Sequence, residues 1–230
     1  MSEYKLLMSI INREQEDAYM DYFKKNGVKA VFSTLCSGTA SKSMLDYLGL
    51  ESNSKVMLSS MVSGENASRL MSGLVSRMGI NLPGTGIALT VPVGSIAGTA
   101  SLRYLAEGQE NQSKNETAVE KVSEIMYSLV VIISEKGCSD MVMDAAREAG
   151  ARGGTVVHAK GTGKEFAAKF FGVSIAAEKE IVYIVTRRSD KDAIMKSVIE
   201  KAGPATDAKA AVFSLPVEDV VGLMSVMKED

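Results

Sequence analysis

The sequence is poor in the residues that build metal centres and disulfide networks. Among its 230 residues are two cysteines and one histidine, and Cys36 and Cys138 lie far apart along the chain. Two such thiols predict neither a disulfide framework nor a metal cluster, and they fit a reducing compartment. His158 has no second histidine and no nearby cysteine, so we expect a partly buried strand residue rather than a metal ligand or catalytic base.

Charge of one sign and long apolar runs are also missing. The formal net charge is −2, and no run of lysine and arginine predicts contact with nucleic acid or a membrane surface. No apolar stretch approaches the roughly 20 residues that span a bilayer. The first residues, MSEYKLLMSII, hold a short apolar run without a basic leader, so they predict a strand rather than a signal peptide. We therefore expect a cytoplasmic globular protein without membrane insertion.

The chain does contain one sequence pattern that occurs twice. Short apolar runs of strand length begin at Leu6 and at Leu129, and the residues that follow them repeat at a nearly constant offset. The matching pairs are Gly27 with Gly150, Gly38-Thr39 with Gly161-Thr162, Gly49 with Gly172, Pro92-Val93 with Pro216-Val217, and Gly98 with Gly222. Glycines that match by chance would not keep this register, so the sequence predicts an internal duplication.

Each copy predicts the order strand–helix–strand–strand–helix–strand. The expected strands are 6–11, 28–35, 55–62 and 86–91 in the first copy, and 129–134, 154–159, 180–186 and 211–215 in the second; the expected helices are 14–26, 66–78, 140–149 and 191–201. We expect Ala18, Tyr22 and Phe23 to form the buried stripe of the first helix, and Ser139 to cap the third. The fold class is α+β: tandem ferredoxin-like βαββαβ repeats, each an antiparallel sheet with helices on one face.

The expected domain boundaries follow from the repeat. We place repeat 1 at residues 1–98, a linker with a helix at 99–126, and repeat 2 at 127–230. Residues 108–115 are polar and without apolar periodicity, whereas apolar residues recur at helical spacing from Glu116 onwards. The sheet face away from the helices is expected to be apolar and exposed, so it needs a partner, either the other repeat or another chain.

Two glycine turns are the candidate ligand sites. The first is Gly161, Thr162, Gly163 and Lys164, preceded by Lys160; the second is Gly84, Thr85 and Gly86. Backbone N–H groups of such turns can hold an anion, with the lysines adding charge. The first turn can equally be a flexible exit from a strand. Since each copy keeps only one of the two turns, we expect a composite site if repeats or chains bring them together.

Other conspicuous residues have structural interpretations. Cys36 is expected to be a small buried hydrophobic residue, because no activating partner stands near it in sequence. Arg187 and Arg188 are expected to be solvated, and Glu218 and Asp219 to cap a helix or turn. No nucleophile lies beside a base, so the residues give no case for catalysis.

The second copy carries a family resemblance. It contains GARGGTVVHAKGTG from Gly150 and FSLPVEDVV from Phe213. In these motifs and in element order, it resembles the PII nitrogen-regulatory signal-transduction proteins. The resemblance implies a cytoplasmic, ferredoxin-like sensor that forms trimers, binds ATP or ADP between subunits, senses 2-oxoglutarate, and presses a long loop against a target enzyme or transporter. It is fainter in the first copy.

The departures from the family are specific. The family's phosphate-contacting lysine would stand at Ala211 or Ile87, and residues 163–180 hold no tyrosine at which to be uridylylated. We expect a non-enzymatic homo-oligomer, with a trimer favoured, that senses a small anionic metabolite or nucleotide and modulates a target in nitrogen or related metabolism. The alternatives are an oligomeric scaffold that has lost its ligand and an enzyme that uses the cleft between repeats.

Overall fold

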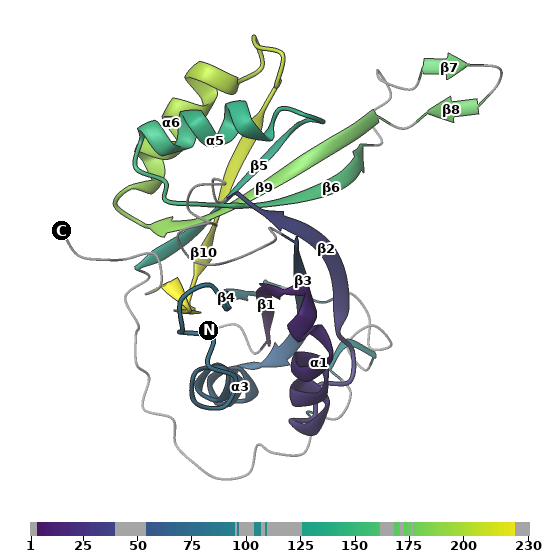
Figure 1. Ribbon diagram of the computed structural model, residues 1–230, viewed down its shortest axis with the longest axis vertical. Coiled ribbons are helices and arrows are strands. Elements are labelled where there is room, and N and C mark those ends of the chain that lie inside the picture. The colour runs from purple at the N-terminus through teal and green to yellow at the C-terminus, as the bar shows by residue number, and fades with distance from the viewer. Residues whose placement is uncertain are drawn as a thin grey trace. The chain divides into compact units, whose positions relative to one another are not determined.

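The chain folds into two compact units, described from a computed structural model whose elements are labelled in Figure 1. The structure describes residues 4–39, 54–94, 96, 104–106, 109, 126–161, 168–170, 173–175 and 177–223. Within residues 160–177 it describes the backbone only. Unit 1 comprises Met1–Leu35, Leu48–Tyr127 and Pro216–Asp230, and unit 2 comprises Cys36–Tyr47 and Ser128–Leu215.

The sheet of unit 1 is built around β1. Its elements are β1 (Tyr4–Asn12), η1 (Arg13–Gln15), α1 (Glu16–Lys25), β2 (Phe32–Gly38, of which the first four residues belong here), β3 (Ser54–Ser63), α3 (Gly64–Ser76), β4 (Gly86–Pro92) and β11 (Asp219–Val221). The strand order is β2-β3-β1-β4-β11. β1 pairs antiparallel with both neighbours, so that Leu7 lies opposite Ser60 of β3 and Thr90 of β4.

The core of unit 1 lies between this sheet and its two helices. Alternate strand residues such as Leu7, Ile11 and Leu58 face α1 and α3 and are fully buried. Tyr19 is buried against this core, whereas Ala18, which was expected in the buried stripe of α1, is exposed. The opposite face is also apolar, as expected, and its residues Met8, Ile10 and Leu89 are buried.

Unit 2 repeats the order with one addition. Its elements are β5 (Tyr127–Glu135), α5 (Ser139–Glu148), β6 (Thr155–Gly161), β7 (Ala168–Phe170), β8 (Val173–Ile175), β9 (Ala177–Arg187), α6 (Lys191–Ala202) and β10 (Ala211–Val217, up to Leu215). The strand order is β10-β5-β9-β6-β2. The helices α5 and α6 pack on one face over a core rich in alanine and valine. The predicted βαββαβ order is thus confirmed in both units.

Several local predictions need correction. β2 begins at Phe32 rather than Val28, and β9 begins at Ala177 rather than Glu180. Ser139 is the first residue of α5 and not its cap; α3, by contrast, is capped by Ser63, whose hydroxyl oxygen accepts a hydrogen bond from the Asn66 N–H. The helix expected in the linker lies outside the described residues, except for Met126 at its end.

Each half of the sequence contributes a segment to the unit that the other half mainly builds. The end of β2 belongs to unit 2, where Ser37 and Gly38 lie opposite Val156 and Thr155 of β6. Conversely, β11 belongs to unit 1, where it pairs antiparallel with β4. A strand that joins a sheet edge satisfies the edge's backbone donors and acceptors, which would otherwise remain open to water or to other chains.

Candidate functional site

The predicted glycine turn at 84–86 lies in unit 1 and is held by close packing and hydrogen bonds. Gly84 has a φ of 78°, a left-handed conformation that favours glycine. A Cβ at Gly86 would lie 2.5 Å from the Ile10 carbonyl oxygen, so a side chain there would displace β1. The Thr85 hydroxyl lies 2.7 Å from the Leu82 carbonyl oxygen and 3.0 Å from that of Ile80, and it ties the turn together.

A lysine that the sequence analysis missed supplies charge at this turn. The Gly84 carbonyl oxygen accepts hydrogen bonds from Asn12 Nδ2 at 3.2 Å and from Lys55 Nζ at 3.3 Å. Lys55 also donates to the Asn12 side-chain oxygen. It comes from the start of β3, far from the turn in sequence, so no local motif indicates it. The carbonyl is thus occupied, and Lys55 brings a positive charge to the turn.

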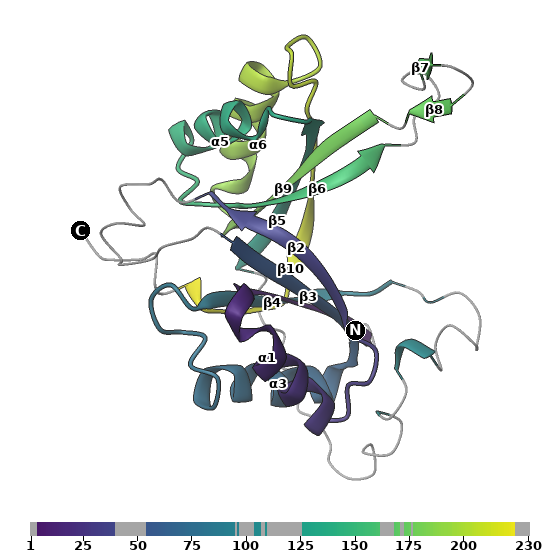
Figure 2. The same cartoon turned by 45° about the vertical axis from the view of Figure 1, so that its right-hand side comes forward.

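Two of the other predicted site residues lie at the end of β6 in unit 2. Lys160 and Gly161 are the last residues of β6, with Gly161 opposite Ala177 of β9. Thr162, Gly163 and Lys164 lie outside the described residues. The loop that was expected after Gly163 contains the β7–β8 hairpin, so β6 and β9 lead into an arm tipped by a second, two-stranded sheet (Figure 2). Because the two turns belong to different units, the composite site remains a prediction.

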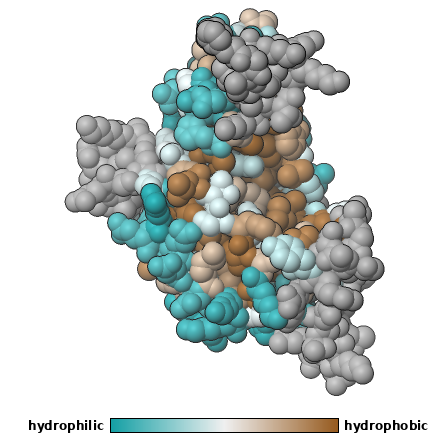
Figure 3. Space-filling view, turned by 90° about the vertical axis from the view of Figure 1, so that its right-hand side faces the viewer, coloured by the Kyte–Doolittle hydropathy of each residue, from teal (hydrophilic) through white to brown (hydrophobic). Residues whose placement is uncertain are grey.

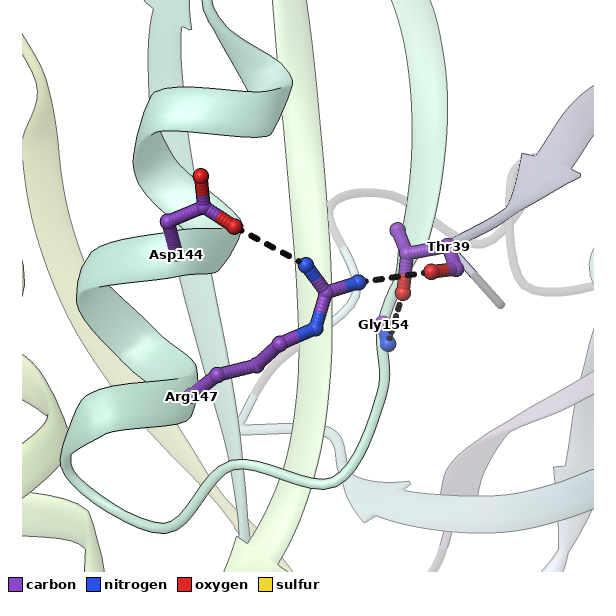
Figure 4. Close-up of polar contacts among 4 residues, drawn as sticks. All are labelled: Thr39, Asp144, Arg147 and Gly154. Atoms are coloured by element: carbon purple, nitrogen blue, oxygen red, sulfur yellow. Dashed lines mark hydrogen bonds and ion pairs between the residues drawn. The ribbon is translucent and has the colours of Figure 1, made fainter. Parts of the chain in front are cut away.

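A polar clasp holds the end of β2 in unit 2 (Figure 4). The Thr39 N–H donates to the Gly154 carbonyl oxygen at 3.0 Å, and the Gly154 N–H donates to the Thr39 hydroxyl oxygen at 2.7 Å. Arg147 of α5 donates from Nη2 to the Thr39 carbonyl oxygen at 2.7 Å, and its Nη1 contacts Asp144 at 3.1 Å. Gly154 is crowded, since a Cβ there would lie 3.1 Å from the Tyr183 carbonyl oxygen. Sequence analysis did not single out this clasp.

A buried carboxylate organises the start of α5. Glu180 is 4% exposed, and its Oε2 accepts a hydrogen bond from the Ser139 N–H at 3.0 Å. It therefore satisfies a helix N-terminus that lacks a side-chain cap of its own. His158 lies opposite Glu180 in the β6–β9 ladder, and its Nδ1 is 3.6 Å from Glu180 Oε1. The His158 side chain is 67% exposed, so the prediction of partial burial is wrong.

Of the remaining predictions, two are confirmed and one is wrong. Cys36 is buried, and Arg187 and Arg188 are exposed, as expected. The expectation that Glu218 and Asp219 cap a helix or turn is wrong: they flank the start of β11, and their carboxylates lie 2.7 and 3.6 Å from the Lys5 ammonium nitrogen.

A polar pocket of about 220 Å³ lies in unit 1, where α1 ends and α3 begins. Its lining includes Lys25 and Arg69, with Asn26, Ser63, Asn66 and Gln109 among the polar side chains. Gln109 Oε1 accepts from the Ser63 N–H at 3.0 Å and from Asn66 Nδ2 at 3.1 Å, while its Nε2 donates to the Met61 carbonyl oxygen at 2.9 Å. The sequence placed Gln109 in an unstructured linker, because only tertiary contacts give it partners.

In the described part of the chain, no group of three histidine, cysteine, aspartate or glutamate side chains is arranged to hold a metal ion. None of the helices described is long and apolar enough to cross a membrane.

The match to a known family lies in the second half of the chain. Residues 127–225 match the family model of nitrogen regulatory protein P-II. Among solved structures, the chain is similar to the crystal structure of Arabidopsis thaliana PII bound to citrate, with 22% identity and a TM-score of 0.34 over 42% of this chain and 82% of that one. No curated protein matches the sequence significantly. The matched residues 127–225 hold β5 to β11 with the helices α5 and α6, and over these residues the chain is similar to nitrogen regulatory protein P-II.

Proposed function

We propose that this protein is a regulator that senses a small anionic metabolite or nucleotide and, in response, modulates a target protein in nitrogen or related metabolism. The observation that supports it is the arm of unit 2: β6 and β9 pair from Thr155 to Gly161 and continue to the β7–β8 hairpin, within the residues that match P-II. A projecting hairpin on a packed sheet is a suitable surface for contact with another protein. The protein acts in the cytoplasm and catalyses no reaction.

The mechanism is a linkage between ligand and target. In this proposal Gly161–Lys164 and Lys160 hold the ligand, and the Gly84–Gly86 turn with Lys55 forms the other wall of the site where repeats or chains bring the two turns together. Binding favours one conformation of the arm and thereby changes its affinity for a target enzyme or transporter. Thermodynamic reciprocity then requires that the target change the ligand's affinity by the same factor.

The proposed assembly is a homo-oligomer, with a trimer favoured. Large apolar side chains remain exposed, including Phe32, Leu35 and Phe213 at 46%, 58% and 44%. Figure 3 shows hydrophobic side chains gathered on one face of the chain and bordered by hydrophilic ones. Apolar surface that is gathered rather than scattered is typical of protein–protein contacts. The ligand-free scaffold remains the alternative function, since it would need the same surfaces.

The test is calorimetric titration of the full chain with ATP, ADP and 2-oxoglutarate. We expect at least one to bind, and Lys164→Ala to weaken that binding about tenfold, because a charge-assisted hydrogen bond contributes roughly 1.5–3 kcal/mol. Lys196→Ala, which removes an exposed lysine on α6, is the matched control. Binding of none of the three ligands supports the scaffold instead.

The same titration also tests whether the ligand binds in the polar pocket of unit 1. Arg69→Ala removes a guanidinium that lies 2.8 Å from Asn66 Oδ1 at the pocket's edge. If this variant abolishes binding while Lys164→Ala and Lys160→Ala leave it unchanged, the ligand occupies the pocket, and the assignment to the glycine turns is wrong.

A further inference from the structure

The polar pocket of unit 1 is lined by charged and amide side chains. Lys25, Glu65 and Arg69 are exposed, whereas Asn66 is only 7% exposed. The charged groups therefore lie on the solvent side of the pocket, and the Asn66 amide lies on its inner side. With a volume of about 220 Å³, the pocket is smaller than the roughly 300–1,000 Å³ that hold drug-sized ligands. It therefore fits a small polar molecule rather than a nucleotide.

Asn66 holds the inner side of the pocket in one arrangement. Its Nδ2 donates to Gln109 Oε1 at 3.1 Å, and its Oδ1 accepts from Arg69 Nη2 at 2.8 Å. Its backbone N–H donates to the Ser63 hydroxyl oxygen at 3.3 Å. The buried amide thus has partners at both ends within the protein. A ligand in this pocket is therefore attracted chiefly by the charged side chains.

Arg69 is positioned by neutral acceptors. Besides its bond to Asn66 Oδ1, its Nη2 donates to the Asn26 carbonyl oxygen at 3.2 Å. Neutral acceptors fix the guanidinium in place without changing its charge. A guanidinium can bind both oxygens of a carboxylate, and Lys25 brings a second positive charge to the same lining. The pocket can therefore attract more than one carboxylate.

The corresponding positions of unit 2 carry neither cation. Counted back from the glycine that follows the first helix of each unit, Glu148 stands in the place of Lys25. Counted back from the glycine that follows the second helix, Ala193 stands in the place of Arg69. Two helices can therefore pack on this kind of sheet without either cation. The pair of cations is a property of unit 1, which indicates a role beyond helix packing.

We propose that this pocket binds an acidic α-amino acid, a molecule with two carboxylates and one ammonium group. The carboxylates face Arg69 and Lys25, and the ammonium group faces Glu65. The charges of the lining and those of the ligand are then opposite in sign, one for one. A dicarboxylate without the ammonium group would place only anions beside Glu65. A ligand with a single carboxylate would meet only one of the two cations.

The inference goes beyond the proposed ligand site at the glycine turns. It assigns a second ligand, of different chemistry, to residues that all belong to unit 1. Neither Lys160 nor Lys164 takes part in it, so the two sites can be tested separately in the same chain.

The test is calorimetric titration of the full chain with L-glutamate at low ionic strength. Glutarate, which lacks the ammonium group, and L-glutamine, which lacks the second carboxylate, are the comparison probes. We expect L-glutamate to bind at least about tenfold more tightly than either. Added salt should weaken its binding, because the charged groups are exposed.

The variants remove one charge at a time. Lys25→Ala and Arg69→Ala should each weaken L-glutamate binding about tenfold. Lys24→Ala is the matched control, because Lys24 is an exposed lysine on the same helix outside the described lining, and it should leave binding unchanged. Arg69→Ala also removes two hydrogen bonds, so Lys25→Ala decides the question if that variant fails to fold.

Glu65→Gln gives the decisive outcome, because it should change the two ligands in opposite directions. It removes the partner of the ammonium group and so weakens L-glutamate, and it removes a like charge and so strengthens glutarate. The assignment is overturned by a wild type that does not bind L-glutamate, by equal affinity for glutarate, or by equal losses in Lys24→Ala and Lys25→Ala.

The two ligand sites fail separately. Lys164→Ala should leave L-glutamate binding unchanged. If ATP, ADP or 2-oxoglutarate binds through the glycine turns and L-glutamate does not bind, this inference alone is wrong. If L-glutamate binds as expected and none of the other three ligands binds, the proposed site at the glycine turns is wrong and this inference stands.

Discussion

Units 1 and 2 place the same elements in the same order but fill their cores with different side chains. The helix core of unit 1 is built on the aromatic residues Tyr19, Tyr22 and Phe23, whereas that of unit 2 uses many alanines, among them Ala146 and Ala202. In unit 1, Gly73 leaves room for Tyr22, whose hydroxyl donates to the Leu70 carbonyl oxygen at 3.0 Å. In unit 2, the small residues let α5 and α6 approach, and Ser197 of α6 donates to the Ala145 carbonyl oxygen at 2.6 Å. The order of elements therefore tolerates exchange of large for small core residues, provided that total packing is kept.

The largest test of this difference removes an aromatic core residue. Phe23 is 1% exposed in unit 1, so Phe23→Ala should lower the free energy of unfolding by about 3–5 kcal/mol, from lost burial and the cavity left behind. Hydrogen exchange should show faster opening of β1 and β3 than of β5 and β9. Equal acceleration in all four strands would mean that the two units unfold as one.

The second test concerns the strand that covers unit 1. Gly222→Val should destabilise the protein by about 2–3 kcal/mol, because a side chain at a positive φ meets backbone oxygens. Amide exchange at Leu89 and Thr90 should then accelerate, since β11 leaves β4. Gly137→Ala is the control: Gly137 also has a positive φ, 82°, but nothing lies within 4 Å of its added Cβ. If both substitutions cost the same, backbone strain rather than docking of β11 explains the loss.

The third test uses pH and the buried tyrosine of unit 1. Burial raises the pKa of Tyr19 from 10.0 to about 12. The folded state therefore holds the proton more tightly than the unfolded state, so the protein is most stable below pH 10 and loses stability as pH rises towards 12. Tyr19→Phe should remove about 2 kcal/mol of that alkaline loss. At neutral pH it should cost little, because the Tyr19 hydroxyl has no hydrogen-bond partner among the described residues.

Tyr104→Phe is the matched control for the alkaline measurement. Tyr104 is 61% exposed in the same unit, so its replacement should leave the difference between pH 9 and pH 12 unchanged. Unfolding by urea at each pH gives the free energies to be compared. An identical alkaline loss in the wild type and in Tyr19→Phe would show that another group controls it.

The smallest expected effect is in the clasp of unit 2. Thr39→Val removes the hydroxyl that accepts from the Gly154 N–H and should cost about 1–2 kcal/mol, because that N–H loses its acceptor. Thr39→Ser keeps the hydroxyl and should restore most of this stability. A double-mutant cycle with Arg147→Ala then shows whether the two contacts on Thr39 act together. Additive losses would mean that Arg147 and Gly154 hold the strand independently.

The fold was largely predictable because its signals are local. Apolar periodicity placed the helices and most strands, and Gly27 and Gly150 were expected at helix ends, where their φ values are 82° and 96°. The boundary of β2 was wrong by four residues, since residues 28–31 are apolar enough for a strand but lie outside it. Ala18 was preferred to Tyr19 because spacing alone does not say which of two adjacent residues faces the core.

The candidate site was less predictable, because its partners are distant in sequence. Lys55 meets Gly84 and Asn12 through the pairing of β1 with its neighbours, and Gln109 meets Ser63 and Asn66 across a long stretch of chain. Neither contact has a local motif. Similarly, the His158 side chain is exposed although it lies opposite the buried Glu180 in the β6–β9 ladder, and its neighbours in sequence do not indicate this exposure.

The amino-acid sequence by itself determined the duplication, the βαββαβ order and the position of the P-II motifs, because these depend on periodicity and on residues close together in the chain. Only the tertiary structure decided which unit each segment joins. Whether the end of β2 pairs with β6, and β11 with β4, depends on which sheet edge is free and on backbone fit at Gly154 and Gly222. Strand pairing uses backbone groups common to all residues, so its partners are chosen by edge availability and steric fit rather than by a sequence code.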